Sequence, residues 1–226
     1  MKKITQLFSV SLFTALVITQ ISCAQTSTNK KEEKKTTENS VMLAAPAANG
    51  KAVAAFAEGC FWCSVHIFEA VNGVDSAIAG YAGGRTKNPT YREVGTETTG
   101  HAESVMVYYD PKVVSYDELL NVFFTSQDPT TPDQQGPDRG SSYRSVIFYK
   151  TPEEKALADA AIVKYNKSGM FKKPIVTEVK NLDIFYRAEE YHQHYIIKNP
   201  NDSYVTNVSL PRFELFKATY KGKLKE

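Results

Sequence analysis

The sequence predicts one two-layer domain of the α/β or α+β class behind an N-terminal export segment. Three observations lead to this prediction. Short apolar runs typical of strands alternate with runs whose apolar residues recur at helical spacing, and a long polar stretch separates both from the N-terminus. With 226 residues, of which 42% are hydrophobic, the chain is long enough for one domain with a sizeable core and some non-core sequence.

The first 24 residues have the pattern of a signal peptide. Two lysines precede an uncharged apolar stretch, 4–22, which Ser and Thr interrupt too often for a transmembrane helix. The small residue Ser22 before Cys23 is typical of bacterial lipoproteins, so we expect a lipidated Cys23 and a membrane-anchored protein of the cell envelope or periplasm. The alternative is cleavage after Ala24, which would release a soluble secreted protein.

A polar linker follows the export segment. Residues 26–40 consist of Lys, Glu, Thr, Ser and Asn without a large apolar side chain, so they cannot offset the entropy lost on ordering. Residues 41–49 are rich in Ala and Pro and continue the linker. We therefore expect a disordered segment over 25–50 and a folded domain over 51–226.

The first strand and helix of the domain are predicted from an apolar run and a helical repeat. Residues 52–57 are apolar and end before Gly59, as in a buried strand. Phe61, Val65 and Phe68 recur at helical spacing, and an Asn-Gly pair at 72–73 closes the helix. The predicted order is strand, tight glycine turn and helix, with Cys60 at the junction.

The remaining elements alternate in the same way along the chain. Proline 152 suits the first turn of a helix, and the β-branched run at 175–179 suits a strand. The further strands are expected at 76–81, 102–109, 143–149 and 175–179, and the further helices at 116–126, 152–166 and 188–195.

The charge balance argues against a nucleic-acid partner. The chain has 27 Lys and Arg residues and 25 Asp and Glu residues, a net charge of +2. Nucleic-acid binding usually needs a field of one sign over a large surface. We therefore expect no such partner.

Cys60 is predicted at the start of a helix, where unpaired N–H groups and the helix dipole favour negative charge. This position predicts a depressed thiol pKa, and the thiolate is the effective nucleophile. The alternative from position alone is a buried structural cysteine, which is common for this residue type.

Cys63 lies three residues after Cys60, so both sulfurs can share one face of a helical turn and form a disulfide. Two cysteines at this spacing are also typical of thioredoxin-like redox sites and of half a zinc site. Zinc is not favoured because the sequence has no second cysteine pair. A c-type haem is excluded because Ser64 stands where its signature requires histidine.

Ten runs in the sequence resemble the A-type peptide methionine sulfoxide reductases. They are GCFW at 59–62, GYAGG at 80–84, NPTYREV at 88–94, TGHAE at 99–103, YDP at 109–111, DP at 128–129, QGPD at 135–138, YRS at 143–145, AE at 188–189 and YHQ at 191–193. The resemblance extends over about 53–215, nearly the whole predicted domain. It implies an α+β fold, a two-layer α/β sandwich of ferredoxin-like type.

The resemblance also implies a reaction and a site. The reaction is reduction of methionine-S-sulfoxide, free or in oxidised proteins, in the repair of oxidative damage, without a metal or an organic cofactor. Cys60 would attack the sulfoxide sulfur, and Glu103 would be a carboxylic acid kept protonated by burial that donates to the sulfoxide oxygen. The remaining substrate-binding residues would be Phe61 and Trp62 around the S-methyl group, Tyr91 and Tyr143 at the oxygen, and Asp138 as a further polar group.

Recycling is the point at which the sequence departs from many members of this family. Residues 199–226 contain no cysteine, whereas many members recycle through cysteines in that region. Cys63 is then the expected resolving thiol, and a thioredoxin-like protein the expected reductant. The alternatives are an inert Cys63 with direct attack of the reductant on Cys60, a general disulfide oxidoreductase of the cell envelope, and a non-enzymatic surface lipoprotein.

Overall fold

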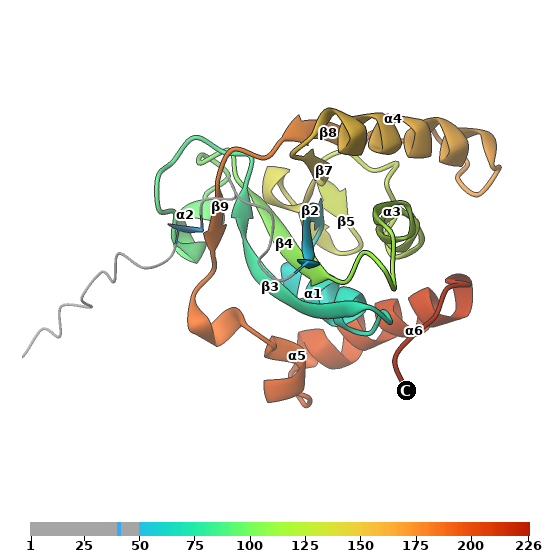
Figure 1. The fold of residues 1–226 in the computed structure, drawn as a ribbon. Coiled ribbons are helices and arrows are strands. Elements are labelled where there is room, and N and C mark those ends of the chain that lie inside the picture. Colours follow the sequence, from blue (N-terminus) through green and yellow to red (C-terminus); the bar gives the residue numbers. More distant parts are fainter. Residues whose placement is uncertain (1–39, 42–49) are drawn as a thin grey trace, which may run out of the picture. The chain divides into compact units, whose positions relative to one another are not determined.

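A seven-stranded sheet forms the centre of the domain in this computed structural model, which describes residues 40–41 and 50–226 (Figure 1). Neighbouring strands are antiparallel except for the last pair, which is parallel. The strand order is β1 (Ser40–Val41), β9 (Phe185–Arg187), β3 (Val74–Ala82), β4 (Ala102–Tyr109), β2 (Ala52–Glu58), β7 (Ser145–Tyr149) and β8 (Glu178–Asn181). The predicted signal peptide, Cys23 and most of the predicted linker lie outside the described residues.

Helices connect and cover the strands. The α-helices are α1 (Phe61–Glu69), α2 (Tyr91–Val94), α3 (Tyr116–Thr125), α4 (Pro152–Lys167), α5 (Tyr195–Lys198) and α6 (Leu210–Thr219). Short 3-10 turns occur at Ser141–Tyr143 and Glu190–His192, and a π-helix, Val205–Ser209, leads directly into α6. A separate two-stranded sheet pairs β5 (Gln134–Gln135) with β6 (Asp138–Arg139). None of the helices in 50–226 is both long and apolar enough to cross a membrane.

The central strands belong to two interleaved β-α-β units. Helix α1 connects β2 to β3, and β4 lies between these two strands; helix α3 precedes β7, and β2 lies between β4 and β7. This is the connectivity of split β-α-β motifs. The predicted α+β class is confirmed.

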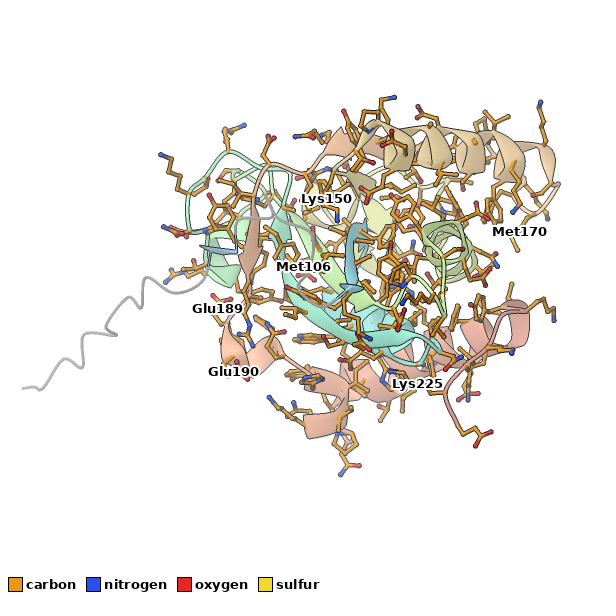
Figure 2. All side chains as sticks on the ribbon, in the orientation of Figure 1. Met106, Lys150, Met170, Glu189, Glu190 and Lys225 are labelled. Atoms are coloured by element: carbon orange, nitrogen blue, oxygen red, sulfur yellow. The ribbon has the colours of Figure 1, made fainter. Side chains whose placement is uncertain are left out.

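The two faces of the sheet are covered differently. One face forms the main core with α1, α3, α4 and α6, through apolar side chains such as Phe56, Phe68 and Phe123. The other face carries a smaller apolar cluster around Met106, which is fully buried, while Met170 beyond the end of α4 is exposed (Figure 2). The four longer helices α1, α3, α4 and α6 therefore all pack on this face, where Val94 of the short helix α2 also contributes, and α1 and α6 lie next to each other there (Figure 1).

Most predicted elements are found at their predicted places, but the C-terminal third differs. The strand predicted at 175–179 begins only at Glu178, because Val176 donates its N–H to the carbonyl of Pro129 in a loop rather than to a strand. The helix predicted at 188–195 is interrupted. Gln193 is extended and its buried amide bonds the backbone of Ala79, and His194 has a left-handed φ of 52°.

The turn between β2 and α1 depends on a glycine. Gly59 has a φ of +88°, and a Cβ at this position would lie 2.5 Å from the Cβ of Gln135. An L-residue at this φ is strained, and the neighbouring chain leaves no room for a side chain. Gly59 therefore fixes the geometry with which the chain enters the helix at Cys60.

We predict that Gly59→Ala destabilises the domain more than Gly169→Ala does. Gly169 has a similar φ of +75°, but a Cβ added there would meet no atom within 4 Å. In Gly169→Ala the free energy of unfolding should fall only by the strain of the backbone conformation, about 1–2 kcal/mol. In Gly59→Ala the steric clash should lower it by about 1–3 kcal/mol more. Denaturant unfolding of both variants measures the difference, and equal losses would show that the contact with Gln135 does not constrain the turn.

Candidate active site

Cys60 occupies the N-cap position of α1, directly before its first residue. Its carbonyl oxygen accepts hydrogen bonds from the N–H groups of Cys63, at 3.1 Å, and of Ser64, at 3.3 Å. Cys60 is 6% exposed and its side chain makes no capping hydrogen bond to the helix. The predicted position at a helix start agrees with the structure.

Glu103 lies beneath this helix start. It extends from β4, is 3% exposed, and its Oε2 accepts the N–H of Phe61 at 3.0 Å. Burial raises the pKa of Glu103 to about 8, against the lowering effect of that hydrogen bond. The carboxyl is therefore mainly protonated at neutral pH and has a proton to donate, as the resemblance implied.

A cavity of about 320 Å³ opens over Cys60. The predicted residues that line it are Cys60, Phe61, Trp62, Tyr91, Asp138 and Tyr143, and three residues not predicted from the sequence, Asp202, Ser203 and Tyr204, complete the lining. Glu103 is not part of the lining and lies below it. Six of the predicted site residues are thus brought to one cavity from the start of α1, α2, β6 and the 3-10 turn before β7, whereas Glu103 and Cys63 do not line it.

Trp62 is held on two sides. Its Nε1–H donates to Nδ1 of His192 at 3.0 Å, and its ring stacks on Tyr195 with centroids 3.7 Å apart and an angle of 6° between the planes. Burial lowers the pKa of His192 to about 4, so the imidazole is neutral at physiological pH and can accept this bond. His192 also lies 4.9 Å, between ring centroids, from Phe61. His192 therefore positions the aromatic wall of the cavity.

The two phenols are positioned by different local structures. Tyr91 begins α2, whose N-terminus has a capping box formed by Thr90 and Glu93, and its N–H donates to Glu189 at 2.9 Å. Burial raises the pKa of Tyr91 to about 12, and burial also raises the pKa of Tyr143, with Glu103 adding to both shifts. Both phenols therefore keep their protons and can donate hydrogen bonds into the cavity.

Cys60 and Cys63 are both free thiols, and they hydrogen-bond to each other. The hydrogen bond from Cys60, with the positive charge of Arg212, lowers the pKa of Cys63 to about 6, whereas burial raises the pKa of Cys60. The prediction of a depressed pKa for Cys60 is therefore wrong for this state of the protein. Burial outweighs the helix N-terminus at Cys60, whereas the hydrogen bond from Cys60 and the charge of Arg212 act at Cys63.

Arg212 and Glu58 form a buried ion pair on the Cys63 side of the helix start. Arg212 donates to Glu58 Oε1 at 3.0 Å, to the Glu58 carbonyl at 2.9 Å and to the Ser126 carbonyl at 2.8 Å. Glu58 is fully buried, and burial raises its pKa to about 7 despite the arginine. Neither residue was predicted as part of the site. Glu58 lies at the end of a strand and Arg212 on a C-terminal helix, and no sequence motif connects two such charged residues.

Tyr204 is a further residue of the cavity that was not predicted from the sequence. Its hydroxyl donates to Asp138 and it lines the cavity together with Cys60, so it connects the C-terminal segment to β6 at the site. The sequence contains a usable signal, since Asp202 is an N-cap type of residue and its Oδ1 accepts the N–H of Tyr204 at 2.8 Å. That signal marks the start of the helical segment over the site.

Within residues 50–226, no three His, Cys, Asp or Glu side chains gather in a way that would hold a metal ion. The polar groups around Cys60 are a neutral acid, phenols and one carboxylate, Asp138. This arrangement suits a substrate with a polar oxygen that accepts hydrogen bonds and a small apolar group beside it.

Comparison with protein families finds one matching family model. The model for "Peptide methionine sulfoxide reductase" matches residues 52–224, which is nearly all of the described domain. Among curated proteins, the chain is similar to "Peptide methionine sulfoxide reductase MsrA" of Natronomonas pharaonis, with 47% identity over 173 residues that cover 76% of this chain and 97% of the relative.

Solved structures give the same result at the level of the fold. The chain is similar to Mxr1 from Saccharomyces cerevisiae in reduced form, with a TM-score of 0.65 and 31% identity over 70% of this chain and 91% of that one. It is also similar to methionine sulfoxide reductase A of Corynebacterium diphtheriae, with a TM-score of 0.61 and 35% identity over 68% of this chain and 77% of that one.

Proposed function

The chain belongs to the peptide methionine sulfoxide reductase family, and on this basis we propose that Cys60 is the nucleophile with which it reduces methionine-S-sulfoxide, free or in oxidised proteins. The hydrogen bond from Phe61 N–H to Glu103 supports the proposed roles of Cys60 and Glu103, because it brings a neutral, buried carboxyl to the residue next to Cys60. The enzyme is an oxidoreductase, and its product is methionine.

The first step transfers oxygen from the substrate to Cys60. The Cys60 sulfur attacks the sulfoxide sulfur, and Glu103 donates a proton to the sulfoxide oxygen. The oxygen then passes from the substrate sulfur to the Cys60 sulfur: the sulfur–sulfur bond formed in the attack and the S–O bond of the substrate both break, methionine leaves, and Cys60 becomes a sulfenic acid. The thiol proton of Cys60 passes along the thiol–thiol hydrogen bond to Cys63, which moves the negative charge onto the attacking sulfur.

The cavity over Cys60 supplies the binding contacts for this step. The phenols of Tyr91 and Tyr143 donate hydrogen bonds to the sulfoxide oxygen, while Phe61 and Trp62 surround the S-methyl group. Asp138 and Tyr204 close the opposite side. The cavity volume of about 320 Å³ suits the end of one methionine side chain and excludes a folded protein segment.

The second step recycles the nucleophile. Cys63 attacks the sulfenic sulfur of Cys60, the S–OH bond breaks, and water leaves as the disulfide forms. A protein dithiol of thioredoxin type then reduces the disulfide by thiol exchange. A general disulfide oxidoreductase is not favoured, because that chemistry has no use for a buried acid and an aromatic cavity beside the cysteine.

We also propose that the enzyme works outside the cytoplasm, attached to the membrane through a lipid on Cys23. The support is the sequence pattern of the first 24 residues and the polar stretch that follows it.

We predict that the first step requires a protonated Glu103. Since the pKa of Glu103 is raised to about 8, the single-turnover rate should fall as the pH rises through that value; it should also fall below about pH 6, where Cys63 is protonated and cannot take up the Cys60 proton. Glu103→Gln keeps a hydrogen-bond donor but has no acidic proton, so the rate should fall by about 10²–10⁴-fold. The decrease in rate as the pH rises through about 8 should also be absent in this variant. Rapid-quench measurement of methionine tests this, and a wild-type rate in Glu103→Gln would assign the proton to another group.

We predict that Cys63→Ser still completes one stoichiometric round of reduction, more slowly because the serine cannot take up the Cys60 proton, and then loses most thioredoxin-driven turnover. The sulfenic acid on Cys60 has no partner thiol in this variant, so a small thiol such as dithiothreitol should restore only part of the rate. Mass spectrometry after one round should find a Cys60–Cys63 disulfide in the wild type and a sulfenic acid in the variant. Full thioredoxin-supported turnover by Cys63→Ser would make Cys63 a packing residue.

We predict that Cys23→Ser abolishes lipid attachment in a bacterial host. Wild-type protein should sediment with membranes and carry a lipid on its N-terminal cysteine, whereas the variant should be found in the soluble fraction or uncleaved. A wild-type protein that is soluble and begins after Ala24 would instead support the secreted alternative.

A further inference from the structure

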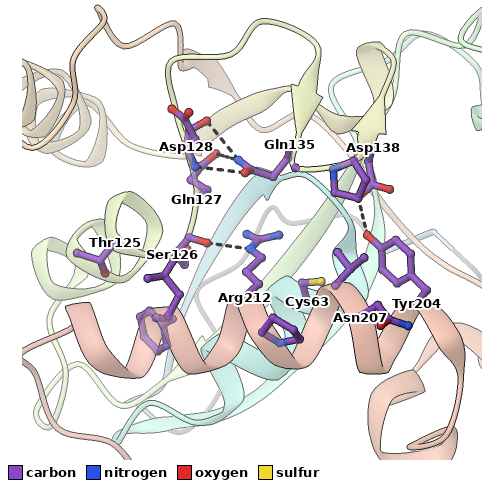
Figure 3. Close-up of a pocket in the computed structure, with 16 residues that line it drawn as sticks. Cys63, Thr125, Ser126, Gln127, Asp128, Gln135, Asp138, Tyr204, Asn207 and Arg212 are labelled. Atoms are coloured by element: carbon purple, nitrogen blue, oxygen red, sulfur yellow. Dashed lines mark hydrogen bonds between the residues drawn. The ribbon is translucent and has the colours of Figure 1, made fainter.

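A second, larger cavity lies on the Cys63 side of the helix start. It has a volume of about 620 Å³ and is lined by Cys63 and Arg212 together with residues of the loop before β5 and of α6 (Figure 3). Cys60 does not line it, whereas Cys63 does not line the cavity over Cys60. Each sulfur of the pair therefore faces its own opening.

Two residues form the wall between the openings. Asp138 and Tyr204 line both cavities, and the hydrogen bond between them joins β6 to the segment that enters the π-helix (Figure 3). The π-helix itself lies over Cys63, because Ser209 within it is 3.3 Å, oxygen to sulfur, from Cys63. π-helical turns within α-helical segments often occur at functional sites.

From this arrangement we propose that the thiol reductant docks at the cavity lined by Cys63 and attacks the Cys63 sulfur, so that substrate and reductant reach the two sulfurs of one disulfide through separate openings. The inference rests on the recycling step proposed above. It assigns to the molecule a reductant site distinct from the substrate site, with α6 as its outer edge.

The charge and burial at the floor of the cavity suit an incoming thiolate. Arg212 points into this region from α6 (Figure 3), and its partner Glu58, with a pKa raised to about 7, compensates its charge only in part. Asp128 and Asp138 also line the cavity, but Arg212 is the charged group that acts most strongly on Cys63, so a thiolate is attracted to the positive charge beside the sulfur that it attacks. The same charge stabilises Cys63 as a leaving thiolate, which speeds its release from a mixed disulfide.

The rim of the cavity indicates a protein rather than a small molecule as the occupant. Val208, Pro211 and Leu215 follow one another at helical spacing along the edge, and Leu215 is 67% exposed. Exposed apolar side chains grouped beside a reactive centre are typical of a protein docking surface. Cys63 is only 1% exposed, so a dithiol that completes both exchanges from one docked position has an advantage over two successive monothiols.

The chemistry balances with a dithiol. One thiolate of the reductant bonds to the Cys63 sulfur, the Cys60–Cys63 bond breaks, and Cys60 leaves as a thiolate. The second thiol of the reductant then attacks the reductant's own sulfur in the mixed disulfide, and Cys63 leaves as a thiolate. The reductant is oxidised to a disulfide, and two electrons and two protons pass to the Cys60–Cys63 pair.

Substitution at the rim tests the docking surface. With thioredoxin kept reduced by thioredoxin reductase and NADPH, Leu215→Glu should raise the KM for thioredoxin at least tenfold. The KM for methionine-S-sulfoxide, the single-turnover yield and turnover with dithiothreitol should stay unchanged. Leu157→Glu, on the exposed face of α4, is the matched control and should change none of these values. An unchanged KM for thioredoxin in Leu215→Glu would overturn the docking site.

A trapped intermediate tests the attacked sulfur. Wild-type protein oxidised by one equivalent of methionine-S-sulfoxide is mixed with thioredoxin in which the second active-site cysteine is serine, and the mixed disulfide is mapped by mass spectrometry. We expect the linkage at Cys63. A linkage at Cys60 would overturn this inference but not the recycling step. Absence of the Cys60–Cys63 disulfide before thioredoxin is added would overturn the recycling step itself.

Discussion

The burial of Glu103 beneath the first amide of α1 is the constraint on which the rest of the site depends. A carboxyl that is 3% exposed and receives one N–H bond, from Phe61, is more stable neutral than charged. The fold contains a polar group in its core, and this group holds a proton at the start of α1, beside Cys60. Burial also raises the pKa of Cys60. Cys60 and Glu103 therefore both stay largely uncharged until Cys63 takes up the proton of Cys60.

The sheet and its helices position Glu103 and Cys60 relative to each other. Strand β4 carries Glu103 to the underside of α1, and Gly59 turns the chain from β2 so that Cys60 begins the helix above it. The C-terminal segment then crosses over the helix start, where Tyr204 and Asp138 divide the surface into two openings. An enzyme that alternates between a substrate and a reductant benefits from this division, because neither partner has to leave before the other can approach.

The sequence predicted the first two-thirds of the domain well because strong local signals determine it. The glycine turn and the helical repeat from Phe61 placed Cys60 correctly at the start of a helix, and the apolar run at 102–109 placed Glu103 on a strand, but only the resemblance implied that Glu103 is buried. The C-terminal third was harder, since its conformation is set by distant contacts. Gln193 leaves the helical path to bond Ala79, and α6 buries only Phe216 among its own residues, so its sequence has no clear apolar stripe. Arg212 and Tyr204 were missed for the same reason. The lowered pKa of Cys63 depends in part on Arg212, far along the chain on α6, and no local pattern reveals it.

Reduction of the two methionine sulfoxide epimers by the purified domain, without any reductant, tests the central claim most directly. We expect the wild-type domain to convert the S epimer to one equivalent of methionine per protein and to leave the R epimer unchanged. Cys60→Ser, with its fold verified by circular dichroism, should produce no methionine. Formation of methionine by Cys60→Ser, or conversion of the R epimer at the same rate as the S epimer, would contradict it.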